Sequence, residues 1–178
     1  LQGDVDLHRV AFSALGCDVI DIRQPHQLSS IDRLVIPGGE STALLKLMFP
    51  WNFLEAIKRF NKPIFGTCAG AILLASQVQP QQSSLELIDM TIERNAYGRQ
   101  IDSFVATGEV IDSALTGDSV SLTFIRAPRI MSVGSAASVL VTHENAPVLV
   151  QQNNCLAATF HPEMNASAVE VLRYFLSL

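Results

Sequence analysis

The sequence predicts an α/β fold in three layers, α/β/α, with a mostly parallel central sheet between two layers of helices. Short apolar runs alternate with helical patterns through the first half of the chain. Hydrophobic residues make up 48% of the chain and charged residues only 16%, as expected for strands that are buried on both faces. With 178 residues, the chain is long enough for one sizeable core, so we expect residues 1–178 to form a single domain.

The predicted elements of the first half follow from apolar spacing. Leu7, Val10, Ala14 and Leu15 repeat at helical spacing, and Gly16 ends that helix. The next predicted elements are strands at 17–22 and 31–36, a helix from Ser41, a helix at 52–60, a strand ending at 65 and a helix at 71–75.

The second half is rich in predicted strands. They lie at 87–92, 102–111, 119–126, 130–133, 137–142, 147–151 and 155–160, separated by Gly, Asn, Pro and Ser. Asn165 is predicted to cap a last helix that continues through Phe175. Residues 77–84, rich in Gln and Ser, are the best candidate for a flexible loop.

Charge and hydropathy exclude two classes of partner. The net charge is −5 and the isoelectric point is about 5.3, which argues against a nucleic-acid groove or an anionic membrane surface. No apolar run approaches the roughly 20 residues of a membrane span. We therefore expect neither nucleic acid nor membrane as a partner.

The cysteines indicate a reducing compartment. Cys17, Cys68 and Cys155 are an odd number and lack the spacing of metal ligands. We expect a cytoplasmic protein with at least one free thiol and without a bound metal. The chain begins without an initiator Met, directly before a helical pattern, so its start is weak evidence about targeting.

The segment Gly66-Thr67-Cys68-Ala69-Gly70 is typical of a nucleophile elbow. It follows a short apolar strand and precedes a helix, with cysteine where hydrolases often have serine. The nucleophile of such an elbow lies on a tight turn, so its small neighbours avoid a clash. The N-terminus of the following helix favours a thiolate.

His161 and Glu163 are candidates for the other two members of a catalytic triad. Residues two apart in an extended chain point to the same side, and Pro162 favours extended backbone at His161. A cysteine nucleophile needs a base, and the base needs an acceptor that fixes its tautomer. Cys68, His161 and Glu163 could fill these roles in that order.

An oxyanion hole needs two N–H donors that point at one oxygen. Ala69, directly after the nucleophile, could supply one. Gly39 could supply the second, from the turn between a predicted strand and a predicted helix at Pro37-Gly38-Gly39-Glu40-Ser41. For the two glycines alone, an ordinary strand-to-helix turn would be the better explanation.

Six segments carry a resemblance to a known family: LQG at 1–3, PGGEST at 37–42, FGTCAGAILLA at 65–75, ERNAYGRQIDSF at 93–104, FIRAP at 124–128 and FHPE at 160–163. On these segments the chain resembles the glutaminase subunits of pyridoxal 5'-phosphate synthase, within the class I (triad) glutamine amidotransferases. GTCAG and FHPE fit many class I glutaminases, whereas PGGEST, RNAYGRQ and FIRAP single out the vitamin B6 branch.

This resemblance implies a flavodoxin-like class I glutaminase architecture, whose first strand would precede LQG. It also implies hydrolysis of L-glutamine to glutamate and ammonia without a cofactor, and delivery of ammonia to a separate (β/α)₈-barrel synthase subunit. The residues that the resemblance assigns to glutamine binding are Gly39, Glu40, Ser41, Arg94, Ile125 and Arg126. Guanidinium groups suit the α-carboxylate of glutamine, although either arginine could instead be a surface residue.

Three alternatives remain at this point. The chain could be a glutaminase of another pathway, a cysteine hydrolase of the same fold, or a non-catalytic regulatory subunit. His8 is predicted to be a solvated helix residue, and Cys17 and Cys155 are predicted to be core residues rather than reactive thiols.

Overall fold

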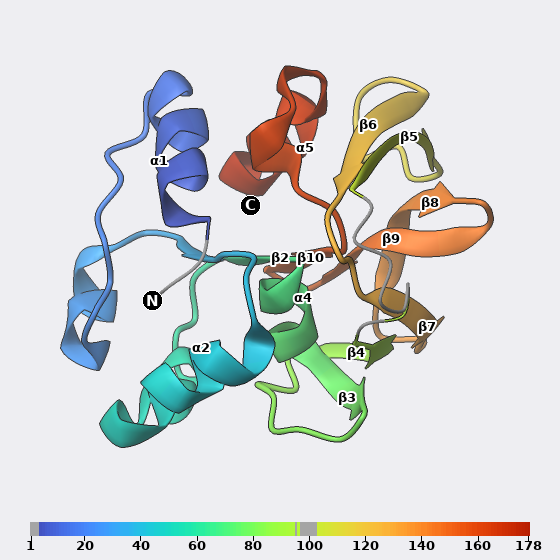
Figure 1. Cartoon of the computed structure of the whole chain (residues 1–178). Coiled ribbons are helices and arrows are strands. Elements are labelled where there is room, and N and C mark those ends of the chain that lie inside the picture. The colour runs from blue at the N-terminus through green and yellow to red at the C-terminus, as the bar shows by residue number, and fades with distance from the viewer. Residues whose placement is uncertain (1–3, 95, 97–102) are drawn as a thin grey trace.

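The computed structural model describes residues 4–94, 96 and 103–178, and its central feature is a seven-stranded sheet (Figure 1). The strands in spatial order are β1 (Leu34–Ile36), β2 (Ile64–Thr67), β10 (Cys155–Ala158), β9 (Ala146–Gln152), β8 (Ser138–His143), β5 (Phe104–Val110) and β6 (Ser119–Phe124). A second sheet has the order β3 (Ala75–Gln79), β4 (Ile88–Glu93) and β7 (Arg129–Val133).

The predicted α/β class is confirmed, and the central sheet is mixed. β2 pairs in parallel with β1 on one side and with β10 on the other. The pairs from β10 through β9, β8 and β5 to β6 are antiparallel. The parallel part of this sheet is therefore confined to β1, β2 and β10, whose carboxyl ends lie at one edge.

Helices cover both faces of the sheet, as the three-layer prediction requires (Figure 1). One layer holds α1 (Val5–Ala14) and α5 (Val169–Ser177). The other holds α2 (Ser41–Met48), α3 (Phe53–Lys58) and α4 (Ala69–Leu74). Short 3₁₀ turns complete the chain at Pro25–Ser30, Phe49–Trp51, Pro162–Met164 and Ala166–Ala168.

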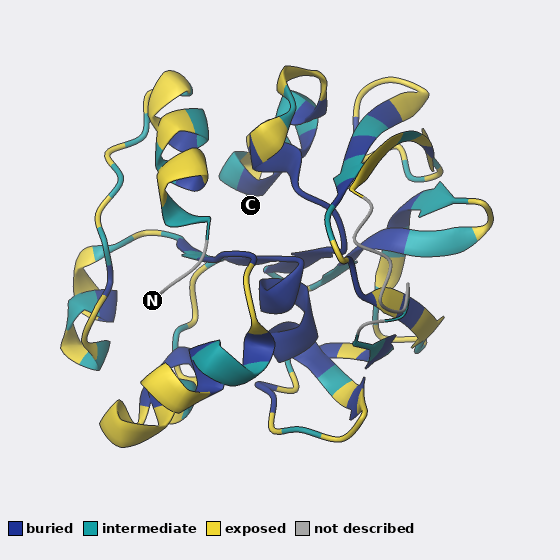
Figure 2. Ribbon diagram, in the orientation of Figure 1, coloured by how far each residue is buried: buried dark blue, intermediate teal, exposed yellow. Residues whose placement is uncertain are grey.

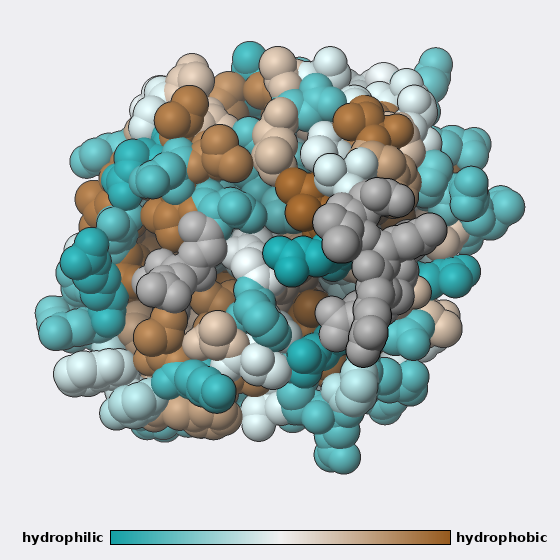
Figure 3. Space-filling view, in the orientation of Figure 1, coloured by the Kyte–Doolittle hydropathy of each residue, from teal (hydrophilic) through white to brown (hydrophobic). Residues whose placement is uncertain are grey.

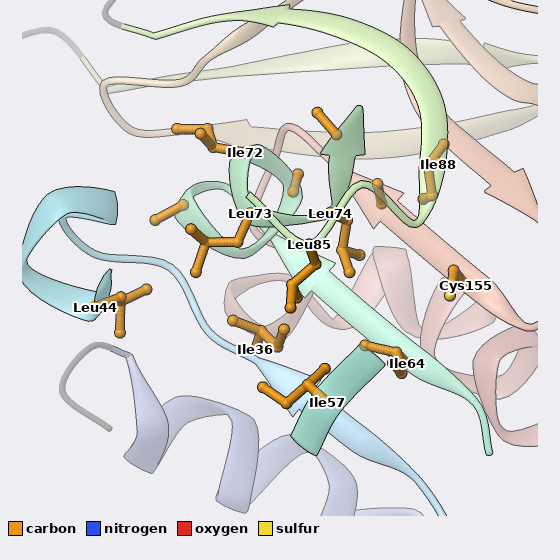
Figure 4. Packing of buried hydrophobic residues seen from close by; sticks show 14 of the residues in the cluster. Ile36, Leu44, Ile57, Ile64, Ile72, Leu73, Leu74, Leu85, Ile88 and Cys155 are labelled. Carbon is orange, nitrogen blue, oxygen red and sulfur yellow. The ribbon is translucent and has the colours of Figure 1, made fainter. Parts of the chain in front are cut away.

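The three parallel strands separate two hydrophobic clusters. Alternate residues of β2 face opposite sides, because Ile64 packs with the α2–α3–α4 layer and Phe65 with the α1–α5 layer. Every residue of β2 and β10 is buried, as Figure 2 shows for the centre of the molecule. Figure 4 shows Ile36, Ile57 and Ile64 packed beneath the leucines of α4.

The predicted strand at 17–22 is wrong. Residues 17–22 follow α1 and form no strand. They line one wall of a groove of about 430 Å³, whose other walls include α1 and β1. Alternation of apolar residues predicted a buried face, but a strand also needs a paired neighbour. β1 pairs only with β2 among the described strands, so its second edge lies beside this groove. The strand expected before LQG stays a prediction.

Helix α1 is apolar on both sides. Its buried residues are His8 and Phe12, whereas Leu7 and Val10 are exposed. Figure 3 shows apolar surface over this helix. Among the described residues, no helix combines the length and the apolar character needed to cross a membrane.

Helix α4 approaches the end of β1 more closely than a side chain would allow. A Cβ atom on Gly70 would lie 2.0 Å from the carbonyl oxygen of Ile36. Helix and strand are therefore in backbone contact at this point. Position 70 accepts glycine alone unless one of the two elements moves.

We expect Gly70→Ala to lower the free energy of unfolding by about 3 kcal/mol, because the methyl group would force α4 away from β1. Chemical denaturation measures this change. Ala71→Gly is the matched control in the same buried helix, with an expected cost of about 1 kcal/mol. Equal stability of Gly70→Ala and the wild type would contradict the close approach.

Candidate active site

Cys68 lies on a strained turn between β2 and α4. Its backbone has φ 49° and ψ −103°, a conformation that non-glycine residues rarely adopt. The Cys68 N–H donates to the carbonyl oxygen of Ala158 at the end of β10, at 2.8 Å. A Cβ atom on Gly66 would lie 2.5 Å from the backbone of Gly70, so the elbow predicted from the two glycines is confirmed.

His161 and Glu163 are in direct contact, but through a different geometry from the extended one predicted. The strand predicted through 160 is too long, because β10 ends at Ala158 and Pro162 begins a 3₁₀ turn that contains Glu163. Proline is favourable at the first position of such a turn. The turn folds the carboxylate back onto the ring, where Glu163 Oε1 lies 2.8 Å from His161 Nδ1.

The imidazole of His161 is buried between Cys68 and Glu163. Its burial lowers the pKa, but hydrogen bonding and charge interactions with Cys68 and Glu163 outweigh burial and raise the pKa of His161 to about 10. His161 Nε2 has no geometrically ideal hydrogen bond within the described residues. Nδ1 faces the Glu163 carboxylate and Nε2 is left without a partner among the described residues, an arrangement that is compatible with a catalytic triad.

Gly38 and Asp4 also lie against the His161 ring, near its Cε1 and Nδ1 atoms. A Cβ atom on Gly38 would lie 2.6 Å from His161 Cε1, so the loop backbone is in contact with the imidazole. Asp4 Oδ2 lies 3.6 Å from His161 Nδ1. Asp4, His161 and Glu163 could offer three ligand atoms within 4.8 Å of one another, but the His161–Glu163 contact already satisfies two of them.

The loop after β1 and Arg94 form a second polar cluster. Gly39 has φ 134°, which favours glycine. Glu40 accepts the N–H of Thr42 and lies 3.6 Å from the guanidinium of Arg94. Ser41 is buried and its hydroxyl donates to Gln82 Oε1 at 3.1 Å, and Arg94 donates to the same oxygen.

The remaining predicted residues surround Cys68. Ala69 is the first residue of α4 and is fully buried. The Cys68 thiol lies 3.9 Å from the carbonyl oxygen of Ile125, and Arg126 beside it is exposed with φ 44°. The roles assigned to Gly39, Ala69, Ile125 and Arg126 stay predictions.

Two residues of the site were not predicted from the sequence. Gln82 belongs to the segment 77–84 that was predicted as a flexible loop, but residues 77–79 are part of β3. The side-chain amide of Gln82 lies between Ser41 and Arg94. His8 was predicted to be solvated, which is wrong, because it is buried against Glu163. Its spacing from Phe12 and Leu15 places it on one helix face, and this signal could have identified it.

Comparison with known proteins agrees with this geometry. The family model described as SNO glutamine amidotransferase family matches residues 1–178. The chain belongs to this family. The resemblance inferred from the motifs is therefore confirmed at the level of the glutamine amidotransferases.

Relatives cover nearly the whole chain. A Koribacter versatilis protein named pyridoxal 5'-phosphate synthase subunit PdxT is 50% identical over 167 residues, which are 92% of this chain and 85% of that protein. A protein of the same name from Thermosipho africanus is 44% identical over 182 residues, covering 100% of this chain and 95% of the relative.

Solved structures support the fold. A crystal structure of a glutamine amidotransferase is 37% identical and has a TM-score of 0.90, over 99% of this chain and 94% of that one. A glutamine amidotransferase from Thermotoga maritima has a TM-score of 0.57 over 93% of this chain and 67% of that one; its 15% identity supports the fold alone.

Two of the motifs lie partly or wholly outside the described residues. These are LQG at 1–3 and, within ERNAYGRQIDSF, positions 95 and 97–102. Of the second motif, Arg94 is described and lies in the polar cluster above.

We expect the pKa of His161 to fall from about 10 toward the ordinary 6.5 in Cys68→Ala, because the hydrogen bond and the charge interaction with Cys68 are lost while burial remains. NMR titration of the imidazole C–H resonances measures it. In the wild type, the raised pKa stabilises the folded state fully below pH 6.5, and this contribution is lost as the pH rises through 10. Cys155→Ala should leave the titration unchanged, and an unchanged pKa in Cys68→Ala would contradict the contact.

Proposed function

We propose that this chain hydrolyses L-glutamine to L-glutamate and ammonia through a thioester on Cys68. The observation that supports this most strongly is the arrangement of the three triad groups. A strained elbow presents the thiol, a buried imidazole interacts with it, and a buried carboxylate holds that imidazole at 2.8 Å. The membership of a glutamine amidotransferase family indicates the substrate.

The reaction has two steps, formation of a thioester and its hydrolysis. The Cys68 thiolate attacks the carboxamide carbon, the C–N bond breaks, and ammonia leaves with a proton from the His161 imidazolium. Water then attacks the thioester carbon as His161 takes a proton from it, and the C–S bond breaks. Glutamate leaves, which restores the Cys68 thiolate and the His161 imidazolium. The raised pKa of His161 keeps the imidazole protonated for the first proton transfer.

Backbone N–H groups of Gly39 and Ala69 would stabilise the oxyanion in both steps. Each lies beside a triad residue, since Gly39 follows the glycine that contacts the His161 ring and Ala69 follows Cys68. Donors fixed before the reaction are effective because they need no reorganisation as charge develops.

The α-carboxylate of glutamine would bind at the cluster of Ser41, Gln82 and Arg94. The guanidinium of Arg94 and the hydroxyl of Ser41 both donate to one oxygen of Gln82, so they already converge on a single acceptor. The substrate carboxylate is a stronger acceptor than an amide oxygen and could replace it. Glu40, Ile125 and Arg126 would complete the binding site.

We expect Cys68→Ala to abolish glutamate release from glutamine while the fold remains, because the nucleophile is lost. A coupled glutamate assay and thermal unfolding measure the two properties. Cys17→Ala and Cys155→Ala are matched controls and should retain activity. Burial raises the pKa of the Cys155 thiol to about 11, so that residue stays protonated and unreactive. Glutamate release by Cys68→Ala at the wild-type rate would overturn the proposal.

We further propose that the ammonia passes to a separate synthase subunit, a (β/α)₈ barrel that makes pyridoxal 5'-phosphate. The support is the name shared by relatives at 50% and 44% identity, pyridoxal 5'-phosphate synthase subunit PdxT. A glutaminase of another pathway is the second candidate, and its partner would differ. Cytoplasmic location stays a prediction.

We expect faster glutamine hydrolysis when the barrel subunit of the same organism is added, because release of ammonia without an acceptor would waste glutamine. Glutamate formation with and without that subunit measures the effect. The matched control is the barrel subunit mixed with the Cys68→Ala variant of this chain, a mixture that should produce no glutamate. Equal turnover with and without the partner, or co-purification with another synthase, would contradict this assignment.

A further inference from the structure

His8 of helix α1 is a second imidazole at the triad carboxylate. Its Nε2 lies 3.4 Å from Glu163 Oε1 and 3.0 Å from the hydroxyl oxygen of Thr67, the residue before Cys68. The side chains of His8 and Glu163 are 5% and 0% exposed, so water does not screen this contact. One ring nitrogen therefore contacts both the strand that ends at the nucleophile and the carboxylate that orients the base.

The position of the His8 ring is fixed by packing. It stacks on Phe12, one helical turn further along α1, at a centroid distance of 6.2 Å. Phe12 in turn contacts Phe175 of α5. Two helices of one layer thus hold the imidazole against the triad.

The surroundings determine the protonation state. Burial lowers the pKa of His8, and the charge of His161 lowers it too, whereas Glu163 and Asp4 raise it. The direction is downward, so the ring is neutral near pH 7 and has a single N–H. Glu163 Oε1 can only accept, and His8 Nδ1 has no partner among the described residues. The N–H therefore belongs on Nε2, because the other tautomer would bury an unpaired donor and direct a lone pair at the carboxylate.

We propose that His8 is a positioning residue for this reaction: its neutral Nε2–H fixes the Glu163 carboxylate and the Thr67 end of β2, which keeps His161 aligned with Cys68. This inference depends on the proposed glutaminase function. A neutral donor suits the role, because it stabilises the carboxylate without competing as a cation with the imidazolium of His161. Glu163 Oε2 has no partner among the described residues, so Oε1 is the oxygen through which the carboxylate is held.

The test compares His8→Leu with His8→Gln in the full chain together with the synthase subunit. Leucine removes the donor at similar size, whereas the glutamine amide can replace Nε2–H. We expect His8→Leu to lower kcat for glutamine hydrolysis about 10- to 100-fold with KM within about threefold, because the lost contact orients the base and does not touch substrate. His8→Gln should recover most of kcat.

Phe12→Leu is the matched control, since it weakens the packing of α1 but keeps the imidazole. Equal loss of kcat in Phe12→Leu and His8→Leu, at equal loss of thermal stability, would overturn the positioning role. Wild-type kcat in His8→Leu would also overturn it. The glutaminase function itself is tested separately, by the loss of glutamate release in Cys68→Ala.

A second measurement is independent of activity and of the folding of the variants. The ¹⁵N shifts of the His8 ring in the wild-type chain report its tautomer, and we expect the proton on Nε2 at pH 7. A proton on Nδ1, or a protonated ring, would overturn the proposal even if the chain hydrolyses no glutamine.

Discussion

The contact between the start of α4 and the end of β1 determines the geometry of the site. Gly70 lies against the Ile36 carbonyl and Gly66 lies against Gly70, so the turn that holds Cys68 has no space for a side chain on either side. The strained backbone of Cys68 persists because these contacts and its hydrogen bond to Ala158 leave it no alternative. The loop with Gly38 and Gly39 begins shortly after Ile36, so the same contact brings that loop close to the turn that holds Cys68.

The chemistry then depends on how a buried carboxylate is stabilised. The Glu163 side chain is fully buried, and an isolated charge in such an environment would be costly. His161 contacts one of its oxygens directly, and His8 approaches the same oxygen from α1. The charge of Glu163 in turn favours the protonated form of His161. The contact between His161 and Glu163 therefore both stabilises the buried carboxylate and favours the protonated imidazole.

The sequence was informative wherever a local pattern determined local structure. The two glycines around Cys68 predicted the elbow because the steric need for them is local. The apolar runs of β2 and β10 predicted strands buried on both faces for the same reason. Triad residues from separate segments could be proposed because parallel strands end at one edge of a sheet.

Features that depend on partners could not be predicted in this way. Residues 17–22 alternate like a strand, but pairing depends on which neighbour is adjacent in space. Leu7 and Val10 made the wrong side of α1 look buried, because that helix is apolar on both sides. The burial of His8 follows from its contacts with Thr67 and Glu163, which lie far from it along the chain.

The contact of Gly38 with the His161 ring lets a residue without functional groups fix the position of that imidazole. Any side chain at position 38 would occupy the space of the ring edge and force the imidazole out of its present position. A saturation mutagenesis experiment scored by glutaminase activity would therefore rank position 38 with the triad. The same experiment scored by folding would rank it among tolerant positions, provided that His161 can move aside.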